Sequence, residues 1–213
     1  MCGIVGYIGK EDAASFLLQS LKRLEYRGYD SAGIAVIERG RLVRVRRAGK
    51  VRDLEAALGD TPLAATVGIG HTRWATHGAP TDENAHPHVD CNGRIAVIHN
   101  GIIENHAPLR RKLADEGHVF SSDTDTEVLA HLIESLDDGN LLEAVRRAVA
   151  QAEGAFAVAV LSQDHPDRII VAKRGSPLVV GRGDDASFIS SDVPALLGRA
   201  SEVQFLADGE FGE

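Results

Sequence analysis

Apolar residues fill positions 4–8 without interruption, a pattern that predicts a strand buried on both faces. Asp12 is suited to cap a helix that we expect over residues 12–26, where apolar residues recur every three or four positions. Chain ends fray unless a sheet holds them. The first strand therefore predicts an N-terminal segment that is fixed in the fold.

A hairpin is predicted next, from strands over residues 33–38 and 41–47 that turn around Gly40. In the second strand valines alternate with Arg44 and Arg46. This alternation predicts that one face of the strand, the face carrying the two arginines, is in contact with solvent.

The rest of the chain is predicted to form strands and helices around one long loop. Residues 73–92 show no sustained period, and we expect them to form an ordered functional loop. The whole pattern predicts one α+β domain over residues 2–213 with antiparallel sheets. The further predicted strands are 66–71, 94–99, 155–161, 168–172, 178–181 and 187–190, and the further predicted helices are 51–58, 104–116, 126–136 and 141–153.

Composition and charge narrow the classes of function. A chain of 213 residues with 44% hydrophobic residues can form a substantial core without covalent staples. The net charge of −8 and the lack of a basic tract argue against nucleic-acid binding. The longest apolar stretch, residues 155–161, is too short to span a membrane, and two cysteines indicate a reducing compartment. We therefore expect a cytoplasmic protein that binds neither nucleic acids nor membranes.

Cys2 is the first candidate for chemistry. We expect Met1 to be removed, because a methionine before a small residue is normally clipped, which leaves Cys2 with a free α-amine. The pKa of an α-amine is about 7.7–8.0, so an amine at this position can act as a base near neutral pH. It can take the proton of its own thiol, as in N-terminal threonine nucleophiles. Cys91, in contrast, is expected to be an inert thiol.

Two further segments are suited to a small acyl substrate. Asn100 and Gly101 follow an apolar strand, where a side-chain amide and a backbone N–H can stabilise an oxyanion. The alternative for this pair is a simple turn. Arg73, at a strand end, can hold a carboxylate in a bidentate fork, and Asp125 can pair with an ammonium group or cap a helix. Together Arg73 and Asp125 would recognise both ends of a free amino acid.

Metal binding has weak support in the sequence. Acidic residues between Asp123 and Glu134 match four positions of a calcium loop, but Val128 stands where that loop needs glycine, and the segment has a helical apolar face. His86 and His88 lack a third ligand nearby in the sequence. We therefore predict that the protein holds no metal and no cofactor.

Seven short segments coincide with one family pattern. They are Cys-Gly-Ile-Val-Gly at 2–6, Leu-Glu-Tyr-Arg-Gly-Tyr-Asp-Ser-Ala-Gly at 24–33, His-Thr-Arg-Trp-Ala-Thr-His-Gly at 71–78, Asn-Ala-His-Pro-His at 84–88, His-Asn-Gly-Ile-Ile-Glu-Asn at 99–105, Thr-Asp-Thr-Glu at 124–127 and Gly-Ser-Pro-Leu at 175–178. In this order they resemble the class II glutamine amidotransferases, which are N-terminal nucleophile (Ntn) hydrolases. Within that family the chain is most similar to the glutaminase domains of the isomerising glutamine–fructose-6-phosphate aminotransferases, the glucosamine-6-phosphate synthases.

The resemblance implies a four-layer αββα sandwich of two antiparallel sheets, the Ntn hydrolase fold. It also implies that Cys2 is the nucleophile and that Asn100 forms the oxyanion hole with the backbone amide of Gly101. Arg73 is implied to bind the α-carboxylate of glutamine, and Asp125 its α-amine.

The same resemblance implies supporting roles around Cys2. Thr76 and His77 would line the pocket, Trp74 would belong to a loop that closes over glutamine, and Arg27 would help to organise the site.

The implied reaction is hydrolysis of L-glutamine to glutamate and ammonia through a glutamyl thioester. In the family the ammonia passes to a C-terminal sugar-isomerase domain, which is absent from this chain, and we expect the longer parent to be a homo-oligomer. One alternative is the glutaminase domain of a phosphoribosylpyrophosphate amidotransferase, although the pattern of that group has His and Gln where this chain has Tyr26 and Tyr29. The other alternative is a catalytically silent domain that binds glutamine.

Overall fold

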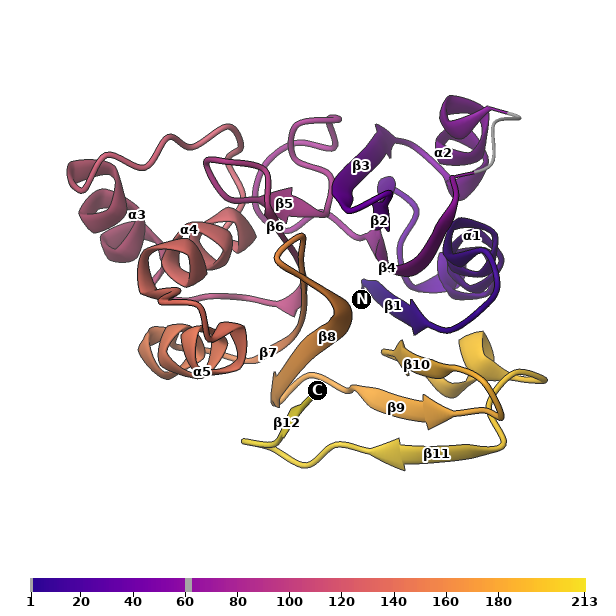
Figure 1. The fold of residues 1–213 in the computed structure, drawn as a ribbon. Coiled ribbons are helices and arrows are strands. Elements are labelled where there is room, and N and C mark those ends of the chain that lie inside the picture. The colour runs from indigo at the N-terminus through magenta and orange to yellow at the C-terminus, as the bar shows by residue number, and fades with distance from the viewer. Residues whose placement is uncertain (1, 60–62) are drawn as a thin grey trace.

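Two antiparallel β-sheets stack face to face, and helices cover the outer face of each sheet (Figure 1). This computed structural model describes residues 2–59 and 63–213, so the predicted loss of Met1 lies outside the described residues. The order of layers is helix, sheet, sheet, helix. It confirms the αββα sandwich predicted from the sequence.

The larger sheet holds the first strand near its centre. Strand β1 (Gly3–Ile8) pairs antiparallel with β4 (Ala65–Arg73) on one side and with β10 (Ser187–Ser190) on the other. Cys2 therefore directly precedes a strand that both neighbours fix. The other strands are β2 (Ser31–Glu38), β3 (Arg41–Ala48), β9 (Val179–Arg182) and β11 (Glu202–Phe205), and the order is β11-β9-β10-β1-β4-β2-β3.

The smaller sheet is built around two strands that carry apolar side chains on both faces. These are β6 (Ile95–Gly101) and β7 (Phe156–Ser162), which pair antiparallel over their full lengths. The other strands are β5 (His88–Val89), β8 (His165–Arg174) and β12 (Phe211–Gly212), and the order is β12-β8-β7-β6-β5.

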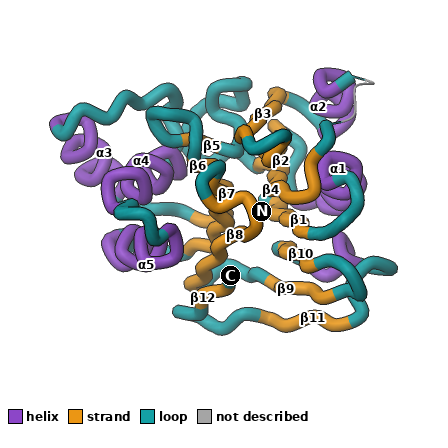
Figure 2. The backbone as a smooth tube through the Cα atoms, in the orientation of Figure 1, coloured by secondary structure: helices purple, strands orange, loops and turns teal. Residues whose placement is uncertain are grey.

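Helices form the two outer layers, as the tube in Figure 2 shows. The first helix, α1 (Ala13–Leu24), begins as predicted at Asp12, whose carboxylate accepts hydrogen bonds from the backbone N–H groups of Ala14 and Ser15. Helix α1 covers the larger sheet together with α2 (Val51–Leu58). The smaller sheet is covered by α3 (His106–Asp115), α4 (Thr126–Leu136) and α5 (Leu141–Gln151). Short 3₁₀ helices are Glu25–Arg27 and Val193–Leu196.

Strand β7 illustrates how a continuous apolar run fills the core on both faces of a sheet. Val158 and Val160 point toward the helices α4 and α5, whereas Ala159 and Leu161 face the larger sheet. Each of these side chains is almost fully buried. Complete burial of a valine or leucine side chain is worth about 1.5–3 kcal/mol, so uninterrupted apolar strands are the expected solution between two covered faces.

The predicted elements exist at the predicted places, with ends that differ by a few residues. The first helix stops at Leu24 rather than near Tyr26, and a 3₁₀ turn follows. Three short strands were not predicted: β5 lies within the expected loop, and β11 and β12 lie near the end of the chain. No helix among the described residues is long and apolar enough to cross a membrane.

The prediction that Arg44 and Arg46 face solvent is wrong. Both side chains are only partly exposed, and their guanidinium groups donate hydrogen bonds to the carbonyl oxygens of Pro87 (3.2 Å) and Ala85 (3.0 Å). Burial lowers the pKa of Arg44 to about 10 and also lowers the pKa of Arg46. The arginine face of β3 therefore packs against the loop at residues 85–87.

Candidate active site

Cys2 lies beside the backbone of Trp74, just beyond the end of β4. The N–H group of Trp74 donates to the sulfur of Cys2 at 3.2 Å, and the thiol contacts the carbonyl oxygen of Trp74 at 3.5 Å. Burial raises the pKa of the Cys2 thiol, although the bond from Trp74 acts in the opposite direction. Near neutral pH this thiol therefore keeps its proton unless a nearby base removes it.

Cys2 lines a cavity of about 280 Å³. The wall brings together residues from the two sheets and from the loop after β4. Of the residues predicted to act here, five line this cavity with Cys2: Arg27, Trp74, Thr76, Asn100 and Gly101. The cavity is large enough for a small amino acid, since pockets that take drug-sized ligands start near 300 Å³.

Three further residues line the same cavity and were not predicted: Ile102, Ser176 and Pro177. Ser176 and Pro177 belong to one of the seven family segments, so that segment was the available signal. Arg73, His77 and Asp125 are not among the described residues that line the cavity.

Both polar atoms of the Asn100 side-chain amide have hydrogen-bond partners in the protein. Its Nδ2 donates to the carbonyl oxygen of Cys2 at 3.0 Å, and its Oδ1 lies 3.0 Å from Nε2 of His71. Because Nε2 of His71 also faces the carbonyl oxygen of His99 at 3.0 Å, this nitrogen meets two acceptors and must carry the proton. Sequence reasoning gave His71 no role, yet the structure makes it the residue that orients Asn100.

His71 is neutral as well as buried. Burial lowers its pKa to about 3, against the opposing effect of its bond to Asn100. With the proton on Nε2, its Nδ1 is an acceptor, and Nδ1 of His86 lies 2.9 Å away as the donor. Burial also lowers the pKa of His86 well below its ordinary value. Both ring nitrogens of His71 are thus engaged within the protein.

Asn100 and Gly101 do not form a turn, because they are the last two residues of β6 and pair with Ala157 and Phe156 of β7. Gly101 has a φ of 127°, and a Cβ added to it would lie 2.0 Å from the carbonyl oxygen of Ala155. Only glycine fits this conformation and this close approach. The requirement for glycine fixes the backbone of residue 101 at the edge of the cavity.

Arg27 connects Cys2 to the larger sheet. Its Nε donates to the carbonyl oxygen of Cys2 at 3.0 Å, and its Nη1 forms an ion pair of 2.8 Å with Asp192. Tyr26 donates to the same carboxylate at 2.7 Å. The carbonyl oxygen of Cys2 therefore accepts hydrogen bonds from both Arg27 and Asn100, which fixes the backbone next to the sulfur.

Arg73 is buried and holds the loop that follows it. Its guanidinium donates to the carbonyl oxygens of His77, Gly78 (3.1 Å) and Ala79 (3.2 Å). Burial lowers the pKa of Arg73, while the charges of Cys2 and Asp125 act to raise it. Arg73 therefore lies close enough to both groups to interact with them electrostatically.

Asp125 occupies the N-cap position of α4, but its side chain makes no capping bond there. Its Oδ2 instead accepts the backbone N–H of Ile103 at 2.8 Å. This buried contact ties the segment after β6 to the start of α4. Asp125 therefore stands at the N-cap position, as the alternative interpretation had it, but its side chain does not form the capping bond.

The loop after β4 places its three predicted residues differently. Trp74 is 46% exposed and meets Tyr29 edge to face, with ring centroids 5.6 Å apart. Thr76 lines the cavity. The ring of His77 packs against the ring of His106 with centroids 5.2 Å apart. The bond of 2.9 Å from the N–H of Ala75 to Asp30 holds this loop near the larger sheet.

Comparison with known proteins relates this arrangement to one family. A family model described as a glutamine amidotransferase domain matches residues 71–198. Similar proteins include a "glutamine–fructose-6-phosphate aminotransferase [isomerizing]" of Symbiobacterium thermophilum, 54% identical over 100% of this chain and 35% of that protein. A protein of the same name from Thermus thermophilus is 57% identical over 99% of this chain and 35% of that protein. The chain thus spans about 35% of the length of these relatives.

Two solved structures are also similar. Glutamine phosphoribosylpyrophosphate amidotransferase from B. subtilis has a TM-score of 0.87 at 28% identity, over 99% of this chain and 46% of that chain. A glutamine aminotransferase class-II domain protein from Silicibacter pomeroyi has a TM-score of 0.65 at 15% identity, over 99% of this chain and 93% of that one, and shows the fold alone. Since the family model covers more than half of the sequence, the chain belongs to the glutamine amidotransferase domain family, in its class II.

Proposed function

We propose that this chain hydrolyses L-glutamine to glutamate and ammonia, with Cys2 as the nucleophile after removal of Met1. The observation that carries the proposal is the cavity that Cys2 shares with Asn100 and Gly101, in a chain of the glutamine amidotransferase family. A nucleophile and two oxyanion donors at one wall of a small cavity are what acyl transfer requires.

The proposed reaction has two steps, formation of a thioester and its hydrolysis. The sulfur of Cys2 attacks the side-chain amide carbon of glutamine, the C–N bond breaks, and the thiol proton leaves with the nitrogen as ammonia. Water then attacks the glutamyl thioester, which releases glutamate and restores the thiol. In both steps negative charge develops on the carbonyl oxygen, where the amides of Asn100 and Gly101 would stabilise it.

The base in this proposal is the α-amine of Cys2. Burial raises the pKa of the thiol, so the first step needs a group that takes the proton. His71 is unsuited to this task, because burial lowers its pKa to about 3, which makes it a weak base, and its two ring nitrogens are engaged with Asn100 and His86. An α-amine has a pKa of about 7.7–8.0, which is close to neutral pH, and it belongs to the same residue as the sulfur.

Recognition of the free amino acid would use two residues of opposite charge, Arg73 and Asp125, that both act on Cys2. Arg73 lowers the pKa of the Cys2 thiol and Asp125 raises it, so both charges act at the sulfur. We assign the α-carboxylate of glutamine to Arg73 and its α-ammonium to Asp125. The bonds from Arg73 to the carbonyl oxygens of residues 77–79 would then link substrate binding to the order of this loop.

Four residues have supporting roles in the proposal. Thr76 lines the cavity, the proposal assigns His77 to the pocket next to it although its ring packs against His106, and Trp74 would belong to the segment that covers the substrate. Arg27 holds the carbonyl group of Cys2, which supports its assignment as a positioning residue.

In a longer parent protein, the ammonia would serve the conversion of fructose 6-phosphate to glucosamine 6-phosphate. Support comes from relatives with that name at 54% and 57% identity. The second candidate is the glutaminase domain of a phosphoribosylpyrophosphate amidotransferase, supported by the TM-score of 0.87 to the B. subtilis structure, but the identity is only 28%. A C-terminal sugar-isomerase domain and a homo-oligomeric parent remain part of this proposal.

The test combines three measurements on the purified chain. We expect intact mass spectrometry to show the loss of Met1. We also expect the chain to release ammonia from glutamine, and an electrophilic glutamine analogue to label Cys2. Cys91, the other thiol, is the internal control and should stay unlabelled. Full activity with Met1 retained would contradict the amine as base, and labelling of Cys91 alone would contradict Cys2 as nucleophile. Binding of glutamine without any ammonia release would favour a silent binding domain.

A further inference from the structure

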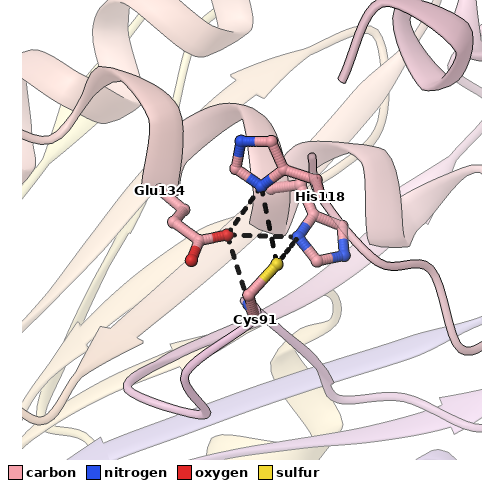
Figure 3. Close-up of side chains that lie close together, drawn as sticks. Cys91, His118 and Glu134 are labelled. Atoms are coloured by element: carbon pink, nitrogen blue, oxygen red, sulfur yellow. Dashed lines mark hydrogen bonds and ion pairs between the residues drawn. The ribbon is translucent and has the colours of Figure 1, made fainter. Parts of the chain in front are cut away.

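Four potential metal ligands converge at a second place in the fold, on the smaller sheet. They are Cys91 in the turn after β5, His118 after α3, and His131 and Glu134 on the last turns of α4. Their ligand atoms all lie within 4.8 Å of one another. Figure 3 shows Cys91, His118 and Glu134 pointing toward a common centre. We refer to these four residues as the Cys91 cluster.

We propose that the Cys91 cluster binds one divalent transition-metal ion of the zinc type. Thiolate and imidazole ligands favour zinc and related ions over magnesium and calcium, which prefer oxygen ligands. A set of one Cys, two His and one carboxylate supplies the four ligands of a tetrahedral site. No residue of the proposed glutaminase reaction belongs to the cluster.

Four of the six distances between ligand atoms are close to those around a tetrahedral ion. Zinc bonds of about 2.3 Å to sulfur and 2.0–2.1 Å to nitrogen or oxygen separate a sulfur from a nitrogen by about 3.6 Å, and a nitrogen from an oxygen by about 3.3 Å. The sulfur of Cys91 lies 3.6 Å from Nδ1 of His118 and 3.5 Å from Nδ1 of His131. The Oε2 atom of Glu134 lies 2.9 Å and 3.2 Å from the same two nitrogens.

The orientation of the two histidine rings is also compatible with an ion. The Nδ1 atom of each ring faces both the sulfur of Cys91 and a carboxylate oxygen of Glu134, so the same nitrogen of each ring can point to a shared ion. If Nδ1 binds a metal, the proton moves to the other ring nitrogen. In His131 that nitrogen, Nε2, is buried without a hydrogen-bond partner among the described residues, and Oε1 of Glu127 lies 3.9 Å from it. A hydrogen bond from the far nitrogen of a histidine to a carboxylate is the usual support of a metal ligand, and Glu127 is the nearby carboxylate that could accept such a bond if the gap of 3.9 Å closed.

Further contacts hold the carboxylate of Glu134 in place. Its Oε1 accepts from Nδ2 of Asn92 at 3.0 Å, and the backbone N–H of Cys91 donates to its Oε2 at 3.2 Å. Cys91 is exposed, which gives an ion a route into the cluster. The ion would link the turn after β5, the segment after α3 and helix α4, so we assign it a structural role.

Cobalt and zinc titrations of the purified, chelator-treated chain test the site. We expect one equivalent of Co²⁺ to give the absorption of a tetrahedral ion together with a thiolate-to-cobalt charge-transfer band, and Zn²⁺ to abolish both. Cys91→Ser should remove the charge-transfer band, whereas the matched control Cys2→Ser, which removes the other thiol, should keep it. Zn²⁺ should raise the midpoint of thermal unfolding for the unaltered chain and for Cys2→Ser, but not for Cys91→Ser.

Glu134→Gln provides a second readout, because it preserves the shape of the side chain. We expect it to weaken Zn²⁺ affinity by about 10–100-fold or more, since even the loss of a supporting partner has that effect. Circular dichroism of each variant checks that it is folded. The proposal is overturned if the unaltered chain shows no charge-transfer band with cobalt, or if the band survives in folded Cys91→Ser.

Discussion

The two cysteines of this chain have different neighbours. Burial raises the pKa of the Cys2 thiol, whereas partial desolvation and the nearby carboxylate of Glu134 raise the pKa of the more exposed Cys91 thiol. Around Cys2 the nearest polar contacts are backbone groups of Trp74 beside a cavity. Around Cys91 they are two imidazole nitrogens and a carboxylate. In our proposals, the groups around each thiol, rather than the thiol itself, favour acyl chemistry at Cys2 and metal binding at Cys91.

The largest expected effect separates the two thiols by activity. Cys2→Ser should lower ammonia release from glutamine by at least about 10³-fold, because a hydroxyl is a far weaker nucleophile than a thiol. Steady-state assays measure the loss, and retention of the cobalt charge-transfer band in the same variant shows that the Cys91 cluster is intact. If Cys2→Ser kept most of its activity, the chemistry would have to be sought elsewhere.

The next prediction concerns the oxyanion donor. Asn100→Ala should lower kcat by about 10²–10³-fold with a much smaller change in KM, since the amide acts mainly in the transition state. A comparison variant, His71→Gln, keeps a donor toward Oδ1 of Asn100 and should have a smaller effect on kcat. A raised KM with an unchanged kcat for Asn100→Ala would instead indicate that the residue only shapes the pocket.

The smallest effect is on stability and comes from the buried histidines beneath Cys2. His71 binds a proton below pH 6.5 when unfolded, but only below about pH 3 when folded. Between these values the unfolded chain holds more protons, so the free energy of unfolding falls as the pH falls. The contribution of His71 is about 1.4 kcal/mol per pH unit.

Urea denaturation between pH 7 and pH 4.5 measures this slope. His86, His88 and His99 also have pKa values that burial lowers, so their contributions have the same sign. In the variant His71→Gln, the free energy of unfolding should change less steeply with pH, by the contribution of one proton, about 1.4 kcal/mol per pH unit. The same slope in both proteins would mean that His71 is charged in the fold.

The Cys2 site could be anticipated because its residues lie in short contiguous segments. Cys2 stands next to the predicted first strand, and Asn100 and Gly101 close another strand. Contiguous family segments of this kind can be recognised in the sequence before the fold is known. What the sequence could not supply is the partner of each side chain, such as His71 behind Asn100, because cross-strand neighbours depend on register.

The Cys91 cluster could not be anticipated in the same way. Its residues come from three separate segments, and only His131 and Glu134 have a regular spacing, three positions apart on one helix. The sequence therefore gave Cys91 no role.

The three strands that were not predicted also lack a signal in the sequence. Strands β5 and β12 have two residues each, and β11 is exposed along its whole length, so none of the three shows an alternation of apolar and polar residues.

The position of β1 between β4 and β10 has a consequence for biosynthesis. Residues 187–190 leave the ribosome long after residues 3–8, by roughly 10–40 s at 5–20 residues per second. Until then one edge of β1 lacks its neighbour. The nascent chain therefore leaves the backbone groups of β1 at Val5 to Ile8 without this strand partner throughout the interval, so the first strand reaches its final pairing only after residues 187–190 have been made.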